Sequence, residues 1–230
     1  MALHRLRPVI AALAALVLFA LSAAPAMAAH LRVEGPKTSL WQAPTKPFVG
    51  TIKGHTTTKQ TALGSLITAS RKKPFQLGLS WSDCCGGGWS GFFVSSIDHV
   101  TPPSTAFWAF KLNNVVAESG LGSTVVTKDS NVLVYYTTFD PNTFATEPTL
   151  DLTASTHKPA VGKPVTFTVT QYDDAGTASA ASGASVWLNG TAHHVGTDGK
   201  LTFRFTRGRF SARATEPGAI RSQRLWVSAS

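Results

Sequence analysis

The chain has 230 residues and a formal charge of +9, with 43% hydrophobic and only 14% charged residues. This composition excludes an intrinsically disordered chain, which would be rich in charge and poor in apolar residues. Residues 1–28 contain two arginines and no acid, so the remainder carries +7, a surplus that favours anionic surfaces. The basic residues are spread thinly and no basic stripe is interleaved with aromatics. We therefore expect a solvated basic face and no nucleic-acid partner.

Residues 1–28 have the pattern of a secretory signal peptide. A basic start, HRLR, precedes the apolar run VIAALAALVLFALSAA, and Ala26-Met27-Ala28 fits a small-x-small cleavage site. We expect cleavage before Ala29 and a secreted protein, extracellular or loosely associated with the cell wall, without a stable membrane anchor. Retention of the run as an uncleaved anchor is the alternative.

Residues 29–139 are expected to form an α+β domain. Apolar residues at three- and four-residue spacing in TTTKQTALGSLITASRKK predict its one helix, with a threonine as N-cap and basic residues at the C-terminus. Alternating apolar and polar residues predict its strands. The predicted strands are 30–35, 48–52, 75–80, 91–97, 106–112 and 123–127 leading into 131–136. Asn113-Asn114 predicts a tight turn, and one helix on a mixed sheet is a two-layer arrangement.

Residues 140–148 are expected to be a linker, because they hold two prolines and an Asp-Pro-Asn turn signal. Residues 149–230 are expected to be an all-β domain. Its predicted strands are 150–155, 164–172, 184–190, 200–206, 209–215 and 220–228, separated by Gly, Asp, Asn and Ser. Roughly seven short strands indicate an immunoglobulin-like β-sandwich without its disulfide. Asn189-Gly190 reads as a hairpin turn rather than a glycosylation acceptor.

The sequence GFFVSSIDHVTPPSTAFWAFKLNNVVAESGLGSTVVTKDSNVLVYYT, with its flanks over residues 30–139, resembles the transcobalamin-like C-terminal domain. The matching features are Ser96-Ile97, Trp108, Asn113, Tyr135-Tyr136, the opening LRVEG and the helix start at Thr61 to Leu63. The sequence departs from the family pattern at Asn114, where a turn glycine is usual, and at Lys128-Asp129, where Gly-Asp is usual. The resemblance implies a β-grasp-like fold and a binding or interaction module.

The same resemblance raises a corrinoid alternative. In vitamin B12 carriers this domain closes over a corrinoid held mainly by a helical partner domain, which we do not find in this sequence. The first alternative function is therefore a corrinoid- or tetrapyrrole-binding accessory protein that acts with a partner. TDGKLTFRFTRGRFSARATEPGAIRS resembles the end strands of bacterial immunoglobulin-like domains, which usually act as spacers or adhesive modules.

The stretch WSDCCGGGWSGFF holds both cysteines of the chain. Adjacent Cα atoms lie about 3.8 Å apart, less than the roughly 4.4–6.8 Å of ordinary disulfides, so a Cys84–Cys85 bond would be strained. Such a vicinal disulfide would present a rigid apolar knob between two tryptophans. The candidate ligand-binding residues are therefore Trp81, Cys84, Cys85, Trp89 and Phe92.

Four other interpretations of the cysteine pair stay open. The thiols are free, they pair with another chain, they bind a metal with Asp83 and His99, or one is a nucleophile with a histidine base. A secreted thiol-redox protein is accordingly the second alternative function. Gly86-Gly87-Gly88 favours tight turning over an anion-binding nest, and His193-His194 favours an exposed hairpin over a metal site.

No pair of carboxylates, Ser-His-Asp set, metal cluster or cofactor fingerprint is evident, so we expect neither an enzyme, nor a metal, nor a cofactor. Trp108, Phe110 and Trp187 are expected in the core. The leading hypothesis is a secreted, non-catalytic binding protein of the bacterial cell envelope or extracellular space. Its partner would be an extracellular ligand or protein, and an anionic cell-wall polymer is a second candidate.

Overall fold

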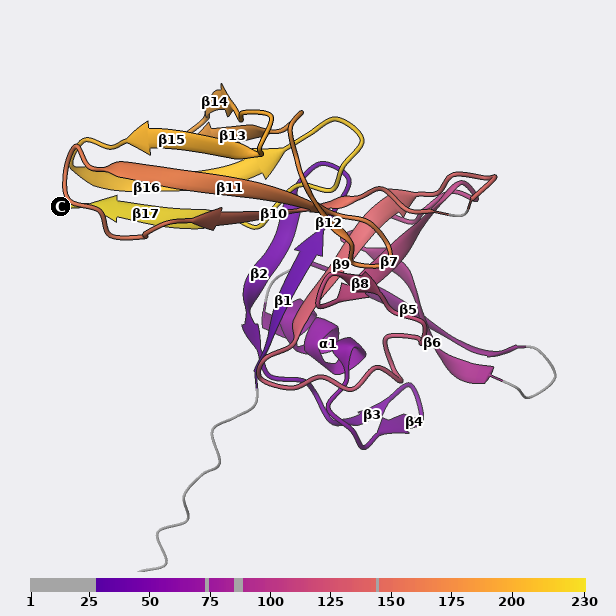
Figure 1. Ribbon diagram of the computed structural model, residues 1–230. Helices are drawn as coiled ribbons and strands as arrows, with labels where there is room; N and C mark the ends of the chain where they lie inside the picture. Colours follow the sequence, from indigo (N-terminus) through magenta and orange to yellow (C-terminus); the bar gives the residue numbers. More distant parts are fainter. Residues whose placement is uncertain (1–27, 73–74, 85–88, 144) are drawn as a thin grey trace, which may run out of the picture.

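The protein is mostly β-strand. The structure is a computed structural model that describes residues 28–72, 75–84, 89–143 and 145–230. Within these residues it has many strands in several sheets and one helix, α1 (Ala62–Lys72) (Figure 1). The predicted predominance of strands and the single helix of the mature chain are confirmed for the described part. We call residues 29–139 the first segment and residues 149–230 the second segment.

The first segment is built around a five-stranded mixed sheet. Its strands are β1 (Ala29–Glu34), β2 (Ser39–Thr45), β3 (Gly50–Ile52), β4 (His55–Thr57), β5 (Leu77–Cys84), β6 (Trp89–Ile97), β7 (Ala106–Leu112), β8 (Val115–Val116) and β9 (Asn131–Thr138). The sheet has the order β2-β1-β9-β7-β8, in which β1 and β9 are parallel and the other pairs antiparallel. β3–β4 and β5–β6 are separate hairpins.

Helix α1 begins at Ala62, in agreement with the helix start expected at Thr61 to Leu63, and Thr56 and Thr57 before it belong to β4. Thr61 is the N-cap: its Oγ1 accepts a hydrogen bond from the amide of Gly64 at 3.2 Å. Two basic residues occupy the last turn, where they complement the helix dipole. The local capping signals therefore fix both ends of the helix.

Residues 123–127 do not form the predicted strand. The contact there is an isolated bridge between Thr61 and Val125. The reason lies in the helix start, where the amide of Ala62 donates to the carbonyl of Thr124 at 2.9 Å. The segment therefore supplies an acceptor for the first amide of α1, which has no partner within the helix.

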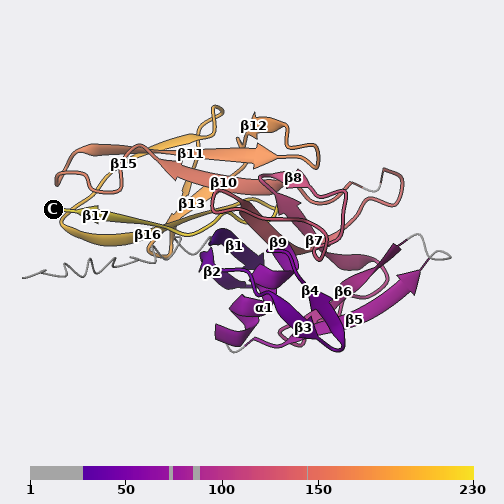
Figure 2. The same ribbon diagram turned by 90° about the horizontal axis from the view of Figure 1, so that it is seen from below.

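The two faces of the central sheet are buried against different partners. On one face, Val33 and Val134 pack in a common core with Leu66 of α1. On the opposite face, Leu133 packs against Ile220 of the second segment. This is the period-2 alternation of strands, and it places α1 and the second segment on opposite sides of the sheet (Figure 2).

The second segment has a sandwich-like architecture of two sheets around one core. Its strands are β10 (Thr149–Ala154), β11 (Pro164–Tyr172), β12 (Ala178–Ala180), β13 (Ser185–Leu188), β14 (Thr191–His194), β15 (Lys200–Arg204), β16 (Gly208–Thr215) and β17 (Leu225–Ala229). In one sheet β10, β12 and β15 all pair with β11, and the other sheet has the order β14-β13-β16-β17. The core between them includes Phe167, Val186, Phe205 and Val227.

Three predictions for the local structure have clear outcomes. Both Asn113 and Asn114 have positive φ, as do Asn189 and Gly190, so the two predicted tight turns are confirmed. Trp187 was wrongly expected in the core. It is 42% exposed, because its neighbours in β13 point inward and its own side chain points to the outer face.

The two segments are joined by a buried polar contact. Lys111 of β7 is fully buried, and its ammonium donates to the carbonyls of Asp173 at 2.7 Å and Tyr172 at 3.1 Å. Asp174 lies 3.8 Å from the same nitrogen. Burial lowers the pKa of Lys111, while Asp174 and then Asp173 act in the opposite sense. Lys111 therefore bridges β7 of the first segment and the end of β11 in the second.

Candidate functional site

A pocket of ~410 Å³ lies in the first segment between β4, β6 and the turn at Gly122-Ser123. One wall is aromatic and consists of His55, Trp81 and Phe92. This volume lies within the range of about 300–1,000 Å³ that is typical of small-molecule sites.

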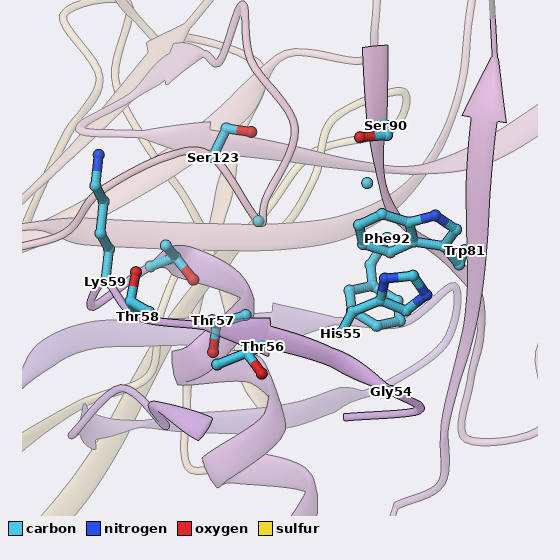
Figure 3. Close-up of a pocket in the computed structure, with 13 residues that line it drawn as sticks. Gly54, His55, Thr56, Thr57, Thr58, Lys59, Trp81, Ser90, Phe92 and Ser123 are labelled. Carbon is cyan, nitrogen blue, oxygen red and sulfur yellow. The ribbon is translucent and has the colours of Figure 1, made fainter. Parts of the chain in front are cut away.

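The aromatic wall is a packed cluster of three rings. The imidazole of His55 lies flat on the indole of Trp81, with ring centroids 3.4 Å apart and planes 10° apart. Phe92 meets both rings edge-on, at 5.0 Å from Trp81 and 5.6 Å from His55. The edge-to-face contacts of Phe92 have a favoured geometry of aromatic pairs, whereas His55 lies nearly face to face on Trp81. The rings therefore support one another as a preformed surface (Figure 3).

Two hairpins position these rings. Lys53 and Gly54 both have positive φ, the geometry of a two-residue turn that pairs Ile52 with His55 and fixes His55 at the start of β4. In the other hairpin Trp81 of β5 is directly opposite Phe92 of β6. The cluster therefore needs both hairpins to be folded.

Two further contacts hold the hairpins in place. The indole nitrogen of Trp81 donates to Asp83 Oδ1 at 2.8 Å, which fixes the rotation of the ring. Lys53 of the β3–β4 turn donates from its ammonium to the carbonyl of Leu79 at 2.5 Å, which ties one hairpin to the other.

The rest of the pocket is polar. Thr56, Thr57 and Thr58 line one side and Lys59 extends beside them, while Ser90 and Ser123 stand across the pocket (Figure 3). Among the described residues that line the pocket, His55 and Lys59 are the only ones with titratable side chains. The pocket thus combines aromatic rings with hydroxyl groups and one cation, which is suited to stacking and to hydrogen bonding with a polyhydroxylated ligand.

The candidate residues from the sequence are only partly placed. Trp81 and Phe92 lie together in the aromatic wall. Cys84 and Trp89 are the last backbone pair of the β5–β6 ladder, and their side chains lie outside the described part of the structure. Cys85 and Gly86-Gly87-Gly88 also lie outside the described residues. The vicinal disulfide and the tight turn at the three glycines therefore remain predictions.

His55 was not among the candidate ligand residues, although it forms one face of the cluster. In the sequence TIKGHTTT, the pair Lys53-Gly54 directly precedes His55 and is a signal for a hairpin turn. No signal in the sequence connects that hairpin with Trp81, which lies far along the chain.

Other candidate groups stand apart from this pocket. His194 is at an exposed position in the β13–β14 hairpin, and one ring nitrogen lies 3.1 Å from the hydroxyl of Ser185. Within the described residues, no three His, Cys, Asp or Glu side chains are arranged to hold a metal ion. Over the same residues, no helix is long and apolar enough to span a bilayer.

Comparison with known proteins adds no family. No protein-family model matches the chain, and no curated protein is significantly similar to it in sequence.

Proposed function

We propose that this chain is a secreted, non-catalytic binding protein of the bacterial cell envelope or extracellular space, and that the pocket beside His55, Trp81 and Phe92 binds a polyhydroxylated ring such as a sugar. The single observation that supports this most is the preformed aromatic cluster facing a wall of hydroxyl groups. Sugar rings offer apolar C–H faces for stacking and hydroxyls at their edges for hydrogen bonds.

The proposal includes the domain organisation predicted from the sequence. The first segment would be a β-grasp-like domain that resembles the transcobalamin-like C-terminal domain. The parallel pairing of β1 with β9, after a helical crossover, supports this. The second segment would be an immunoglobulin-like domain that acts as a spacer or second contact, which its two packed sheets support. Residues 1–28 would be removed as a signal peptide.

The test is a titration with three neutral tetrasaccharides, in which isothermal calorimetry measures binding. The sugars are chitotetraose, cellotetraose and maltotetraose. We expect at least one to bind the wild-type protein and Trp81→Ala to weaken that binding by about tenfold or more. Trp187→Ala is the matched control, because Trp187 is an exposed tryptophan of the second segment and does not line the pocket. It should bind as the wild type does.

Two results would contradict the proposal. The first is that none of the three sugars binds at millimolar concentration. The second is that Trp81→Ala binds as well as Trp187→Ala while circular dichroism shows both folded.

The alternatives from the sequence keep their own tests. A visible-absorption titration with a cobalamin would detect corrinoid binding. Intact mass after alkylation, with and without reductant, would report the state of Cys84 and Cys85. A two-proton deficit in the unreduced monomer indicates the vicinal disulfide, and two alkylated thiols without reductant would support the redox alternative.

A further inference from the structure

A second pocket, of ~400 Å³, lies between the two segments. β2 of the first segment contributes one side, from Ser39 to Gln42. β16 and the region of β17 contribute the other side, with Arg213, Arg224 and Trp226. It has no lining residue in common with the pocket beside Trp81, so it is a separate site.

The surroundings of this second pocket carry a surplus of positive charge. Arg213 and Arg224 line it, and the guanidinium of Arg209 lies 4.2 Å from the ring centre of Trp226. The nearby carboxylate, Glu34, is already engaged: its two oxygens lie 3.8 Å from Arg32 Nε and 3.4 Å from Arg221 Nε. Glu34 therefore offsets only part of the positive charge of these arginines, and an anion entering the pocket would meet the remainder.

A hydrogen bond across the junction positions the side chain of Arg213. Its Nη2 donates to the hydroxyl of Ser39 at 2.8 Å, across the junction of the segments. Its Nε is buried and has no hydrogen-bond partner among the described residues. Burial lowers the pKa of Arg213, Glu34 raises it, and Arg224 and Arg221 lower it further. A negative group in the pocket would relieve the repulsion between Arg213 and Arg224.

Trp226 adds an apolar surface beside these cations. Its side chain is 44% exposed, because Leu225 and Val227 on either side of it in β17 point toward the core of the second segment. An exposed indole next to guanidinium groups matches a sugar ring that carries an acid group: the ring contacts the indole and the acid pairs with arginine.

We propose that this second pocket binds an acidic carbohydrate, with Arg213 and Arg224 pairing to its carboxylate or phosphate and Trp226 contacting its ring. This site goes beyond the neutral-sugar pocket and does not depend on it. A single-stranded nucleic acid would also offer anions and rings. The continuous row of stacking aromatics expected for such a strand is not evident. Trp226 is exposed, but the other tryptophan that lines this pocket, Trp41, is partly buried against the core of the first segment.

The experiment measures binding of tetragalacturonate (carboxylate), mannose 6-phosphate (phosphate), maltotetraose (neutral) and an octathymidylate to the full mature chain at 150 mM salt. We expect one of the two acidic sugars to bind and maltotetraose not to bind at this site. Arg224→Gln and Trp226→Ala should each weaken the acidic sugar by about tenfold. Lys163→Gln is the charge-matched control, because Lys163 is exposed and lies in the turn before β11. It should leave binding unchanged.

Three results would overturn the proposal: neither acidic sugar binds, Lys163→Gln weakens binding as much as Arg224→Gln, or the octathymidylate binds more tightly and is lost in the same variants. Trp81→Ala serves to separate the two sites. It should leave acidic-sugar binding intact, and a parallel loss in Trp81→Ala would likewise contradict a separate site.

Discussion

The imidazole of His55 lies against the indole of Trp81 in near-parallel contact, with 3.4 Å between ring centroids. His55 belongs to β4 and Trp81 to β5, so the contact is the point at which two independent hairpins meet. Lys53 supports the same meeting through its bond to the carbonyl of Leu79. The aromatic wall of the first pocket is therefore a tertiary feature and depends on both hairpins at once.

Replacement of His55 should expose one face of Trp81. We expect His55→Ala to lower the free energy of unfolding by about 1 kcal/mol, the usual contribution of an aromatic pair, and to shift tryptophan emission to longer wavelength. Urea denaturation and steady-state fluorescence measure the two effects. His194→Ala, at an exposed hairpin position, should change neither. Unchanged emission and stability in His55→Ala would contradict the stacked geometry.

Lys111 should be decisive for the junction of the two segments. Lys111→Met leaves two backbone carbonyls and Asp174 without the cation that they surround. We expect a loss of about 1–3 kcal/mol, because two carbonyls lose the buried donor that they share, whereas Asp174 is 31% exposed and keeps its hydrogen bonds to Thr146. Differential scanning calorimetry checks this, and separate transitions for the two segments are the expected form of the loss.

Lys163→Met is the control for Lys111→Met. It removes an exposed lysine and should stay within about 0.5 kcal/mol of the wild type. A loss below about 1 kcal/mol in Lys111→Met would show that the segments hold together without this contact.

Tyr135 should make stability depend on pH in the alkaline range. Thr146 gives its hydroxyl proton to Asp174, so Tyr135 must be the donor in its own 3.0 Å bond to Thr146. Burial raises the pKa of Tyr135 from about 10 to about 12, and the carboxylates of Asp174 and Glu147 act in the same sense. The folded state holds the proton more tightly than the unfolded state, so this contribution is complete below pH 10 and is lost as the pH rises toward 12.

The measurement for Tyr135 is the difference in unfolding free energy between wild type and Tyr135→Phe. We expect it to be constant from pH 7 to 9.5 and then to fall by an amount on the order of 2 kcal/mol by pH 12. The subtraction removes the titration of lysines and of the other two tyrosines, which both proteins share. A difference that stays flat to pH 12 would show that the pKa of Tyr135 is not raised.

Local signals predicted local structure well. The turns at Asn113-Asn114 and Asn189-Gly190 follow from the tolerance of Asn and Gly for positive φ. β2 was missed because SLWQAPT contains Pro44 and no clean alternation. It is an edge strand, where a proline without an amide proton is tolerated. The exposure of Trp187 could have been predicted from the sequence. Its neighbours Val186 and Leu188 are apolar, and side chains of adjacent strand residues point to opposite faces of a sheet.

The first pocket could not be predicted in the same way. Its lining comes from residues 54–59, Thr61, Trp81, residues 90–92 and residues 122–123, and packing around α1 brings these stretches together. The sequence identified Trp81 and Phe92 through their local density of aromatics, but not His55. The second pocket is harder still, because Ser39 and Arg213 belong to different segments and meet only at the junction.

Gly64 tests the packing on which the helix, and thus the first pocket, depends. In an ordinary helix Gly→Ala stabilises by about 1 kcal/mol. Here a Cβ at position 64 would collide with the backbone carbonyl oxygen of Phe48, whose amide donates to the carbonyl of Gly64 at 2.9 Å. We therefore expect Gly64→Ala to destabilise the protein by roughly 1–3 kcal/mol, the opposite sign. Urea denaturation checks it, with Ser70→Ala on the same helix as the control. Ser70→Ala should cost little, and a stabilised Gly64→Ala would mean that the chain at Phe48 does not pack against α1.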